Sequence, residues 1–190
     1  MGLRGLSLAL LCLAAPTFAQ DAPPPWVGEA RQSAQQLGTQ LKQALLTAIE
    51  SEGLIAAIEV CQRQAPAIAE ELSGDQGSVG RTALRVRNPD NRPDAWEQRI
   101  LAEFEARLAA GEAPGNLERF AIRRLDDRRV GHWMKAIPTD GLCLACHGSE
   151  IAPELRQAIE QRYPEDQATG FGPGSLRGAF SVQIELPSSD

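Results

Sequence analysis

The chain is organised around one stretch, Cys143-Leu144-Ala145-Cys146-His147, which Gly148 follows directly. Its Cys-x-x-Cys-His spacing is the attachment motif of c-type haem. Two thiols three positions apart can each form a thioether with one vinyl group of the haem. A histidine directly after the second thiol can then be the proximal ligand of the iron. The motif therefore predicts one covalently attached haem c, bound through Cys143, Cys146 and His147.

Three other kinds of site can contain a Cys-x-x-Cys pair. A thioredoxin-like redox motif lies between a strand and a helix in a βαβ pattern, which this sequence does not show. A zinc site needs four ligands, and only Cys61 and His132 remain to complete one. A structural disulfide leaves His147 without a role. Haem attachment is the interpretation that uses all three motif residues.

The first 19 residues have the pattern of a secretory signal peptide. Arg4 supplies the positive charge, Leu6 to Ala15 form a short apolar run, and Thr17-Phe18-Ala19 ends in small residues suited to a signal peptidase. The apolar run is too short to span a bilayer comfortably as a helix. We expect a cleaved signal peptide over 1–19, a single domain over 20–190 and a periplasmic protein without stable membrane insertion.

Removal of the signal peptide changes the cysteine count and the net charge. Cys12 lies in the signal, so three of the four cysteines remain, and Cys61 is the one outside the haem motif. An odd cysteine in an oxidising compartment needs a reason. Loss of Arg4 takes the net charge from −6 to about −7, which argues against nucleic acid or an anionic membrane as a partner.

Apolar residues recur at helical spacing through the N-terminal third. The pattern predicts a long helix over Val27 to Glu52, a break at Gly53, and a second helix over Leu54 to Leu72 that Pro66 kinks or restarts. Cys61 falls on the apolar stripe of the second helix. This placement favours a buried free thiol, whereas ligation of the iron by a Cys61 thiolate would protect it from oxidation.

Two further side chains are candidates for the sixth iron ligand. His132 and Met134 share one face of a strand predicted over 129–138. A methionine ligand tends to raise the reduction potential, and a thiolate lowers it. Without a ligand role, His132 is a surface histidine and Met134 is a core residue.

Arginines are frequent in the stretch 80–93. Apolar residues alternate with them there, which predicts a strand that ends in a turn at Asn88-Pro89. Guanidinium groups match carboxylates, so Arg81 and Arg87 are candidates to bind the haem propionates. A solvated strand face explains the same pattern equally well.

The remaining elements complete an α+β domain with an antiparallel sheet flanked by helices. They are a helix over Ala95 to Ala110 capped by Asp94, two strands over Leu117 to Arg124 and Arg129 to Pro138 joined at Asp126-Asp127, a helix over Ala152 to Arg162, and a strand over Arg177 to Leu186.

Four stretches taken together resemble the Tll-type haem domain, a bacterial family with one c-haem and a PAS-like fold. The stretches are Val60-Cys61 through Ala65-Pro66-Ala67-Ile68-Ala69, Gly80-Arg81-Thr82 through Arg87-Asn88-Pro89-Asp90-Asn91 and Trp96-Glu97, Ile137-Pro138 through Cys143 to Gly148, and Tyr163 to Gly170 through Arg177-Gly178-Ala179-Phe180-Ser181-Val182. The resemblance covers nearly the whole mature chain.

This resemblance implies a PAS-like fold in which His147 is the proximal haem ligand and Cys61 is the distal one. His132 and Met134 then have structural roles. It also places Asn88 beside the arginines as a candidate to contact the haem. We expect the free-standing form of the domain, without a kinase or cyclase region.

Two functions follow from a His/Cys-ligated haem. The first is electron transfer with a redox partner protein, in which both ligands stay bound. The second is sensing, in which reduction releases Cys61 and a diatomic gas such as CO or NO takes its place. Catalysis of the peroxidase kind ranks last, because His132 is the only obvious acid–base candidate, and we expect no enzyme.

Overall fold

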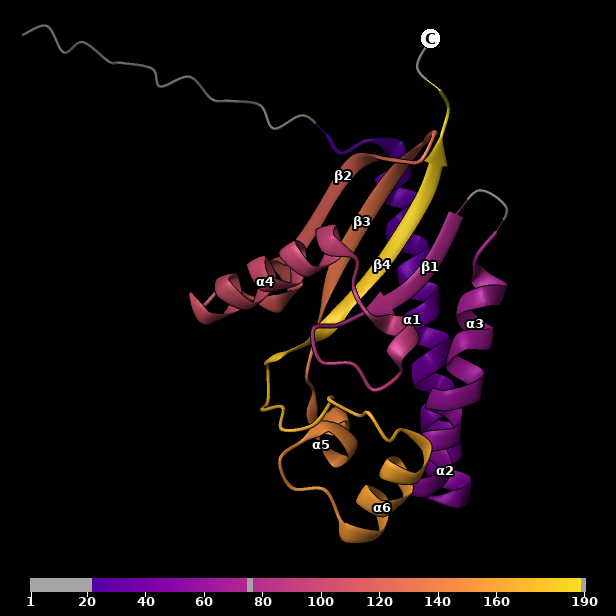
Figure 1. The fold of residues 1–190 in the computed structure, drawn as a ribbon, viewed down its shortest axis with the longest axis vertical. Helices are drawn as coiled ribbons and strands as arrows, with labels where there is room; N and C mark the ends of the chain where they lie inside the picture. The colour runs from indigo at the N-terminus through magenta and orange to yellow at the C-terminus, as the bar shows by residue number, and fades with distance from the viewer. Residues whose placement is uncertain (1–21, 75–76, 189–190) are drawn as a thin grey trace, which may run out of the picture.

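The computed structural model of the chain describes residues 22–74 and 77–188 (Figure 1). The expected signal peptide over 1–19 lies outside these residues. The elements in chain order are α1 (Pro25–Glu52), α2 (Leu54–Glu59), the π-helical segment η1 (Val60–Gln64), α3 (Ala65–Leu72), β1 (Gly77–Thr82), the 3-10 turn η2 (Pro89–Asn91), α4 (Ala95–Ala109), the 3-10 turn η3 (Pro114–Asn116), β2 (Glu118–Leu125), β3 (Arg128–Pro138), α5 (Gly141–His147), α6 (Pro153–Arg162) and β4 (Leu176–Leu186).

The strands form one antiparallel sheet in the order β1-β4-β3-β2. Strands β2 and β3 make the predicted hairpin, and the turn between them includes Asp126 at a positive φ of 53°, which aspartate tolerates better than most residues. Strand β4 returns to the middle of the sheet, between β1 and β3. The predicted α+β class, with an antiparallel sheet and a long N-terminal helix, is confirmed.

Helices cover both faces of the sheet (Figure 1). Helices α1 and α3 pack on one face, where Trp26 and Leu37 meet Trp133 of β3. Gly131 permits this contact, because a Cβ atom there would lie 2.7 Å from the Trp26 ring. Helix α4 packs on the opposite face through a cluster of buried residues, Leu101, Phe104, Leu117, Met134, Ala136, Leu176 and Ala179.

Helix α4 begins as the sequence predicts. The Asp94 side chain accepts hydrogen bonds from the backbone N–H groups of Trp96 and Glu97, both at 2.8 Å. The Glu97 side chain accepts the Asp94 N–H in return. This reciprocal capping satisfies N–H groups that a helix start otherwise leaves without partners.

Two predicted elements differ from the structure. The second helix is three pieces, because η1 winds residues 60–64 as a π-helix before Pro66 opens α3. The strand predicted through residue 87 ends at Thr82. Beyond Thr82 the chain pairs elsewhere: the Ala83 N–H reaches the Asn91 carbonyl, and the Val86 carbonyl accepts the Gln167 N–H at 2.9 Å.

Helices α5 and α6 lie at one end of the sheet, and α6 lies next to α2 (Figure 1). Helix α6 packs against Ile58 of α2 through Leu155 and Ile159. The haem motif on α5 is therefore held opposite the segment that carries Cys61. No helix in the described part of the chain combines the length and the apolar character that crossing a membrane requires.

Candidate functional site

The haem motif forms the short helix α5, which has a defined start and end. The Asp140 side chain accepts hydrogen bonds from the Cys143 N–H and from the Cys143 thiol, both at 3.2 Å. Gly148 ends the helix, and a Cβ atom there would lie 2.6 Å from the Leu144 carbonyl oxygen. Within the helix, the spacing of three and four residues puts Cys143, Cys146 and His147 on one face.

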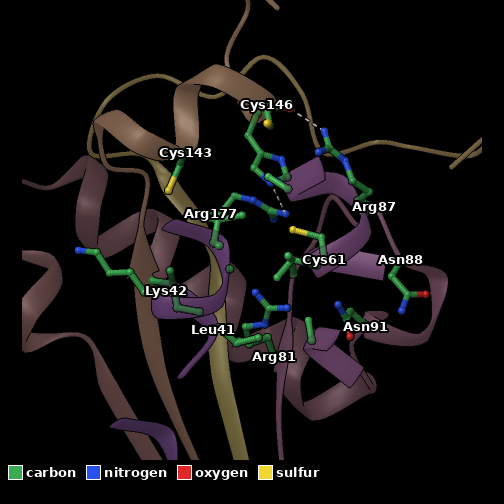
Figure 2. Close-up of a pocket in the computed structure, with 18 of the residues that line it drawn as sticks. Leu41, Lys42, Cys61, Arg81, Arg87, Asn88, Asn91, Cys143, Cys146 and Arg177 are labelled. Atoms are coloured by element: carbon green, nitrogen blue, oxygen red, sulfur yellow. Dashed lines mark hydrogen bonds between the residues drawn. The ribbon is translucent and has the colours of Figure 1, made fainter. Parts of the chain in front are cut away.

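That face borders a cavity of about 280 Å³. Its apolar wall comes from α1 and α2, including Leu41, Leu45, Ala57 and Ile58. The seven residues that the motif, the arginine-rich stretch and the family resemblance assign to the haem site all line it, namely Cys61, Arg81, Arg87, Asn88, Cys143, Cys146 and His147. They come from η1, β1, the loop after β1 and α5, so the fold gathers one group from four separate segments (Figure 2).

His147 is held in one orientation and one tautomer. Its Nδ1–H donates to the Ala168 carbonyl oxygen at 2.7 Å, so Nε2 carries the lone pair. Burial and the nearby Arg177 and Arg87 guanidinium groups lower the pKa of His147 to about 2, which keeps the imidazole neutral. A neutral imidazole with Nδ1–H bonded to a carbonyl and the lone pair on Nε2 is the form that ligates a metal.

Cys61 lies across the cavity from the haem motif. Its side chain is partly exposed, and Figure 2 shows its sulfur directed toward the middle of the cavity, with the Arg177 guanidinium close by. The interpretation of Cys61 as a thiol buried in the core is therefore wrong. Cys61 lies within the π-helical segment η1, and such segments occur often at functional sites.

Two arginines of the cavity, Arg81 and Arg177, form no salt bridge in the described part of the chain. Within residues 22–74 and 77–188, no carboxylate lies within salt-bridge distance of either guanidinium. Burial lowers the pKa of Arg81, against an opposing effect of Cys61 and Tyr163. Burial, Arg87 and Arg81 lower the pKa of Arg177 to about 10. Two half-buried cations without an anion fit a ligand that carries carboxylates, as haem does.

Arg87 and Asn88 line the cavity but use their polar groups elsewhere. Arg87 Nε donates to Asp166 Oδ2 at 3.1 Å, and its Nη2 donates to the carbonyl oxygen of Cys146 at 2.6 Å. Asn88 Oδ1 accepts the Asp90 N–H at 3.1 Å and so caps η2. Figure 2 shows the Asn88 side chain directed away from the middle of the cavity. Of the predicted propionate partners, Arg81 keeps an unpaired guanidinium.

The sequence reasoning missed Arg177 as a site residue. Its Nη2 lies 3.4 Å from His147 Nε2, which places its guanidinium beside the imidazole. The sequence feature that could have indicated it is the position of Arg177, at the start of an otherwise half-buried strand and beside Gly178. At Gly178 a Cβ atom would lie 2.5 Å from the Thr82 carbonyl oxygen, and this close crossing brings Arg177 to the end of β1.

His132 and Met134 lie on the α4 side of the sheet and do not border the cavity. The expectation of a surface histidine is wrong, because His132 is 0% exposed. Its Nδ1 accepts from Arg123 at 2.7 Å and its Nε2–H donates to Ser181 Oγ at 2.8 Å. Both ring nitrogens are therefore engaged. Among the described residues, no three His, Cys, Asp or Glu side chains come together as a metal site.

These features define a class: an α+β domain with a cavity in which two motif thiols and an imidazole face a third thiol and two unpaired arginines. The Tll0287-like family matches residues 26–185, and the chain belongs to that family. Its structure is similar to the crystal structure of the cyanobacterial heme-protein Tll0287, with a TM-score of 0.65 and 25% sequence identity over 89% of this chain and 100% of that one. A search of curated proteins finds no match.

Proposed function

We propose that the chain is an exported, mono-haem c-type cytochrome that transfers electrons. The observation that carries the proposal is the cavity itself, where His147 presents Nε2 and Cys61 presents its thiol from the opposite side. The similarity to a protein described as a heme-protein supports it.

Each residue then has a stated role. Cys143 and Cys146 would attach one haem covalently, and His147 and Cys61 would ligate its iron. Arg81 and Arg177 neutralise the propionates, which gives both guanidinium groups the partner that they lack in the protein. When bound, the haem supplies a one-electron couple between ferric and ferrous iron.

The remaining wall controls what reaches the site. Leu41, Leu45, Ala57 and Ile58 exclude water from the α1 and α2 side, and a low local polarity is one of the means by which a protein tunes a reduction potential. With His147 and Cys61 as ligands, the protein itself would supply both iron ligands outside the haem ring. We therefore propose electron exchange with a redox partner protein in the periplasm, and no catalysis.

A second candidate function is sensing of redox state or of a diatomic gas such as CO or NO. The observation that favours it is the π-helical geometry of η1 around Cys61. A π-helix is a locally wider turn inside an α-helix, and it often marks a functional hinge or site. Rearrangement of η1 would withdraw the Cys61 thiol and open its position to a gas.

Haem attachment is tested in protein exported by a host that has the machinery for c-type haem. We expect a haem-stained band on a denaturing gel, because a thioether survives denaturation, and loss of that stain in Cys143→Ser/Cys146→Ser. The matched control is Cys61→Ser, which should keep the stain. A wild-type band without stain would contradict covalent attachment.

A further inference from the structure

A short segment outside the motif determines the orientation of His147. We call residues 166–171 the strap. The Gly170 and Phe171 N–H groups donate to the Gly148 and His147 carbonyl oxygens, both at 2.9 Å. The strap also supplies the Ala168 carbonyl that accepts His147 Nδ1–H. It therefore runs along the end of α5, bonded both to the backbone and to the imidazole of the proposed proximal ligand.

One guanidinium joins the strap to α5. The Arg87 and Asp166 side chains are paired at 3.0 Å and are only 7% and 8% exposed. Arg87 Nη2 also donates to the carbonyl oxygens of Cys146, at 2.6 Å, and of Ala168, at 3.4 Å. Asp166 Oδ1 accepts the Ala168 N–H at 2.8 Å. Both charged groups thus converge on Ala168, the residue that bonds His147.

A second arginine holds the strap from the solvent side. Arg85 is exposed, and its Nη1 donates to the Thr169 carbonyl oxygen at 2.8 Å. Its guanidinium lies 3.8 Å from the centre of the Phe171 ring, which in turn meets the His147 ring edge to face at 6.3 Å. Arg85 and Arg87 therefore both bind the strap through hydrogen bonds.

We infer that Arg87 and Asp166 are positioning residues for His147, which hold the Ala168 carbonyl where it fixes the Nδ1–H tautomer and the direction of Nε2. This inference rests on the proposed function, because it concerns the ligand that His147 provides. A buried ion pair is weak evidence for stability by itself, since hydrophobic residues of similar volume often replace it without loss. In this ion pair, Asp166 bonds the Ala168 N–H and Arg87 bonds the Ala168 carbonyl oxygen, so the pair can fix the position of that residue. Partners beyond the direct ligands set the orientation and basicity of a ligating histidine.

The neighbouring residue provides a matched control. Glu165 pairs with Arg92 at 3.2 Å, but these side chains are 71% and 58% exposed, and the pair touches neither Ala168 nor His147. The test compares Asp166→Asn, which removes the charge at nearly constant shape, with Glu165→Gln. Asp166→Glu retains the charge and serves as the conservative variant.

Two readouts separate positioning from general stability. In protein made without the haem-attachment machinery, ¹⁵N NMR of the imidazole reports the His147 tautomer. In haem-loaded protein, the ferric EPR spectrum and the reduction potential report the ligand. For Asp166→Asn we expect a mixture of tautomers, more than one low-spin ferric species, and a shift to a more positive potential because the imidazole is less basic. Glu165→Gln should match wild type, and Asp166→Glu should restore most of the wild-type signals.

A single Nδ1–H tautomer together with a wild-type EPR spectrum and potential in Asp166→Asn would overturn the inference. If Asp166→Asn does not accumulate, Arg85→Ala decides, because it loosens the strap at an exposed position. A smaller change of the His147 tautomer and of the reduction potential in the same direction supports the inference, and no change in either overturns it. The tautomer is read without haem, so absence of haem from the wild type would refute the proposed function and leave this test intact.

Discussion

The buried cluster on the α4 face of the sheet and the cavity at one end of the sheet carry charged groups in opposite states. On the α4 face, Ser181 donates to Glu97 at 2.6 Å, His132 bonds Ser181, and Arg123 bonds both His132 and Asp94. In the cavity at one end of the sheet, Arg81 and Arg177 have no carboxylate partner among the described residues. Buried polar groups in native proteins almost always have partners. The cluster with complete pairing is therefore structural, and the one with unpaired cations is where a ligand belongs.

The largest expected effect comes from breaking the paired cluster. Glu97→Ala removes the acceptor of the Ser181 hydroxyl and of the Asp94 N–H. It leaves both donors without this acceptor, and it takes away the carboxylate beside the buried His132. We expect the free energy of unfolding to fall by about 3 kcal/mol, measured by urea denaturation, with an unchanged haem spectrum. Glu105→Ala, at an exposed position on α4, is the control. A changed haem spectrum in Glu97→Ala would contradict the distinction between a structural cluster on the α4 face and a ligand-binding cavity.

A second experiment contrasts a paired arginine with an unpaired one in haem-free protein. Arg87→Leu breaks a buried ion pair and should lower the free energy of unfolding by about 3 kcal/mol. Arg177→Leu removes a half-buried cation without a carboxylate and should raise the free energy of unfolding by about 1 kcal/mol. Changes of opposite sign in the free energy of unfolding, measured by urea denaturation, support the comparison. A loss of equal size in both variants would show that Arg177 already has a stabilising partner in the protein.

The smallest effect is the pH dependence of the paired cluster. Burial raises the pKa of Glu97, but hydrogen bonds from His132, Ser181 and the Asp94 backbone outweigh it and hold the pKa below 4.5. A carboxyl whose folded pKa is depressed stabilises the fold above its unfolded pKa, and this stability is lost as pH falls through the folded value. Between pH about 6 and about 3, Glu97→Gln should therefore lose less stability than wild type. If urea denaturation shows that the two proteins lose the same free energy of unfolding as the pH falls, the depressed pKa of Glu97 is contradicted.

The sequence allowed much of the fold to be predicted, because local patterns determine those parts. The helical spacing through α1 ends at Gly53, which adopts a positive φ of 85°, and the Asp94 cap begins α4. The hairpin of β2 and β3 follows from alternation and from Asp126-Asp127. The motif residues are three and four positions apart on α5, so their common face needed no tertiary information.

The rest depends on contacts between distant segments. Periodicity cannot distinguish the π-helical turn of η1 from an α-helix, so Cys61 was placed on the core stripe. Alternation also extended β1 through residue 87, because the competing bond between Val86 and Gln167 joins residues far apart in the chain. Arg87 became a propionate candidate for the same reason: its partner Asp166 is 79 positions away. Arg177 enters the cavity only through the close crossing at Gly178.

The most direct test of the central claim is a comparison of wild type with Cys61→Ala by visible and EPR spectroscopy, in the ferric state, after reduction with dithionite, and after addition of CO. The account predicts a low-spin ferric thiolate spectrum in wild type that Cys61→Ala loses while its haem stays attached. A wild-type ferrous form that does not bind CO supports electron transfer, and one that binds CO supports the sensor. Identical ferric spectra in the two proteins would contradict ligation by Cys61 and with it the proposed site.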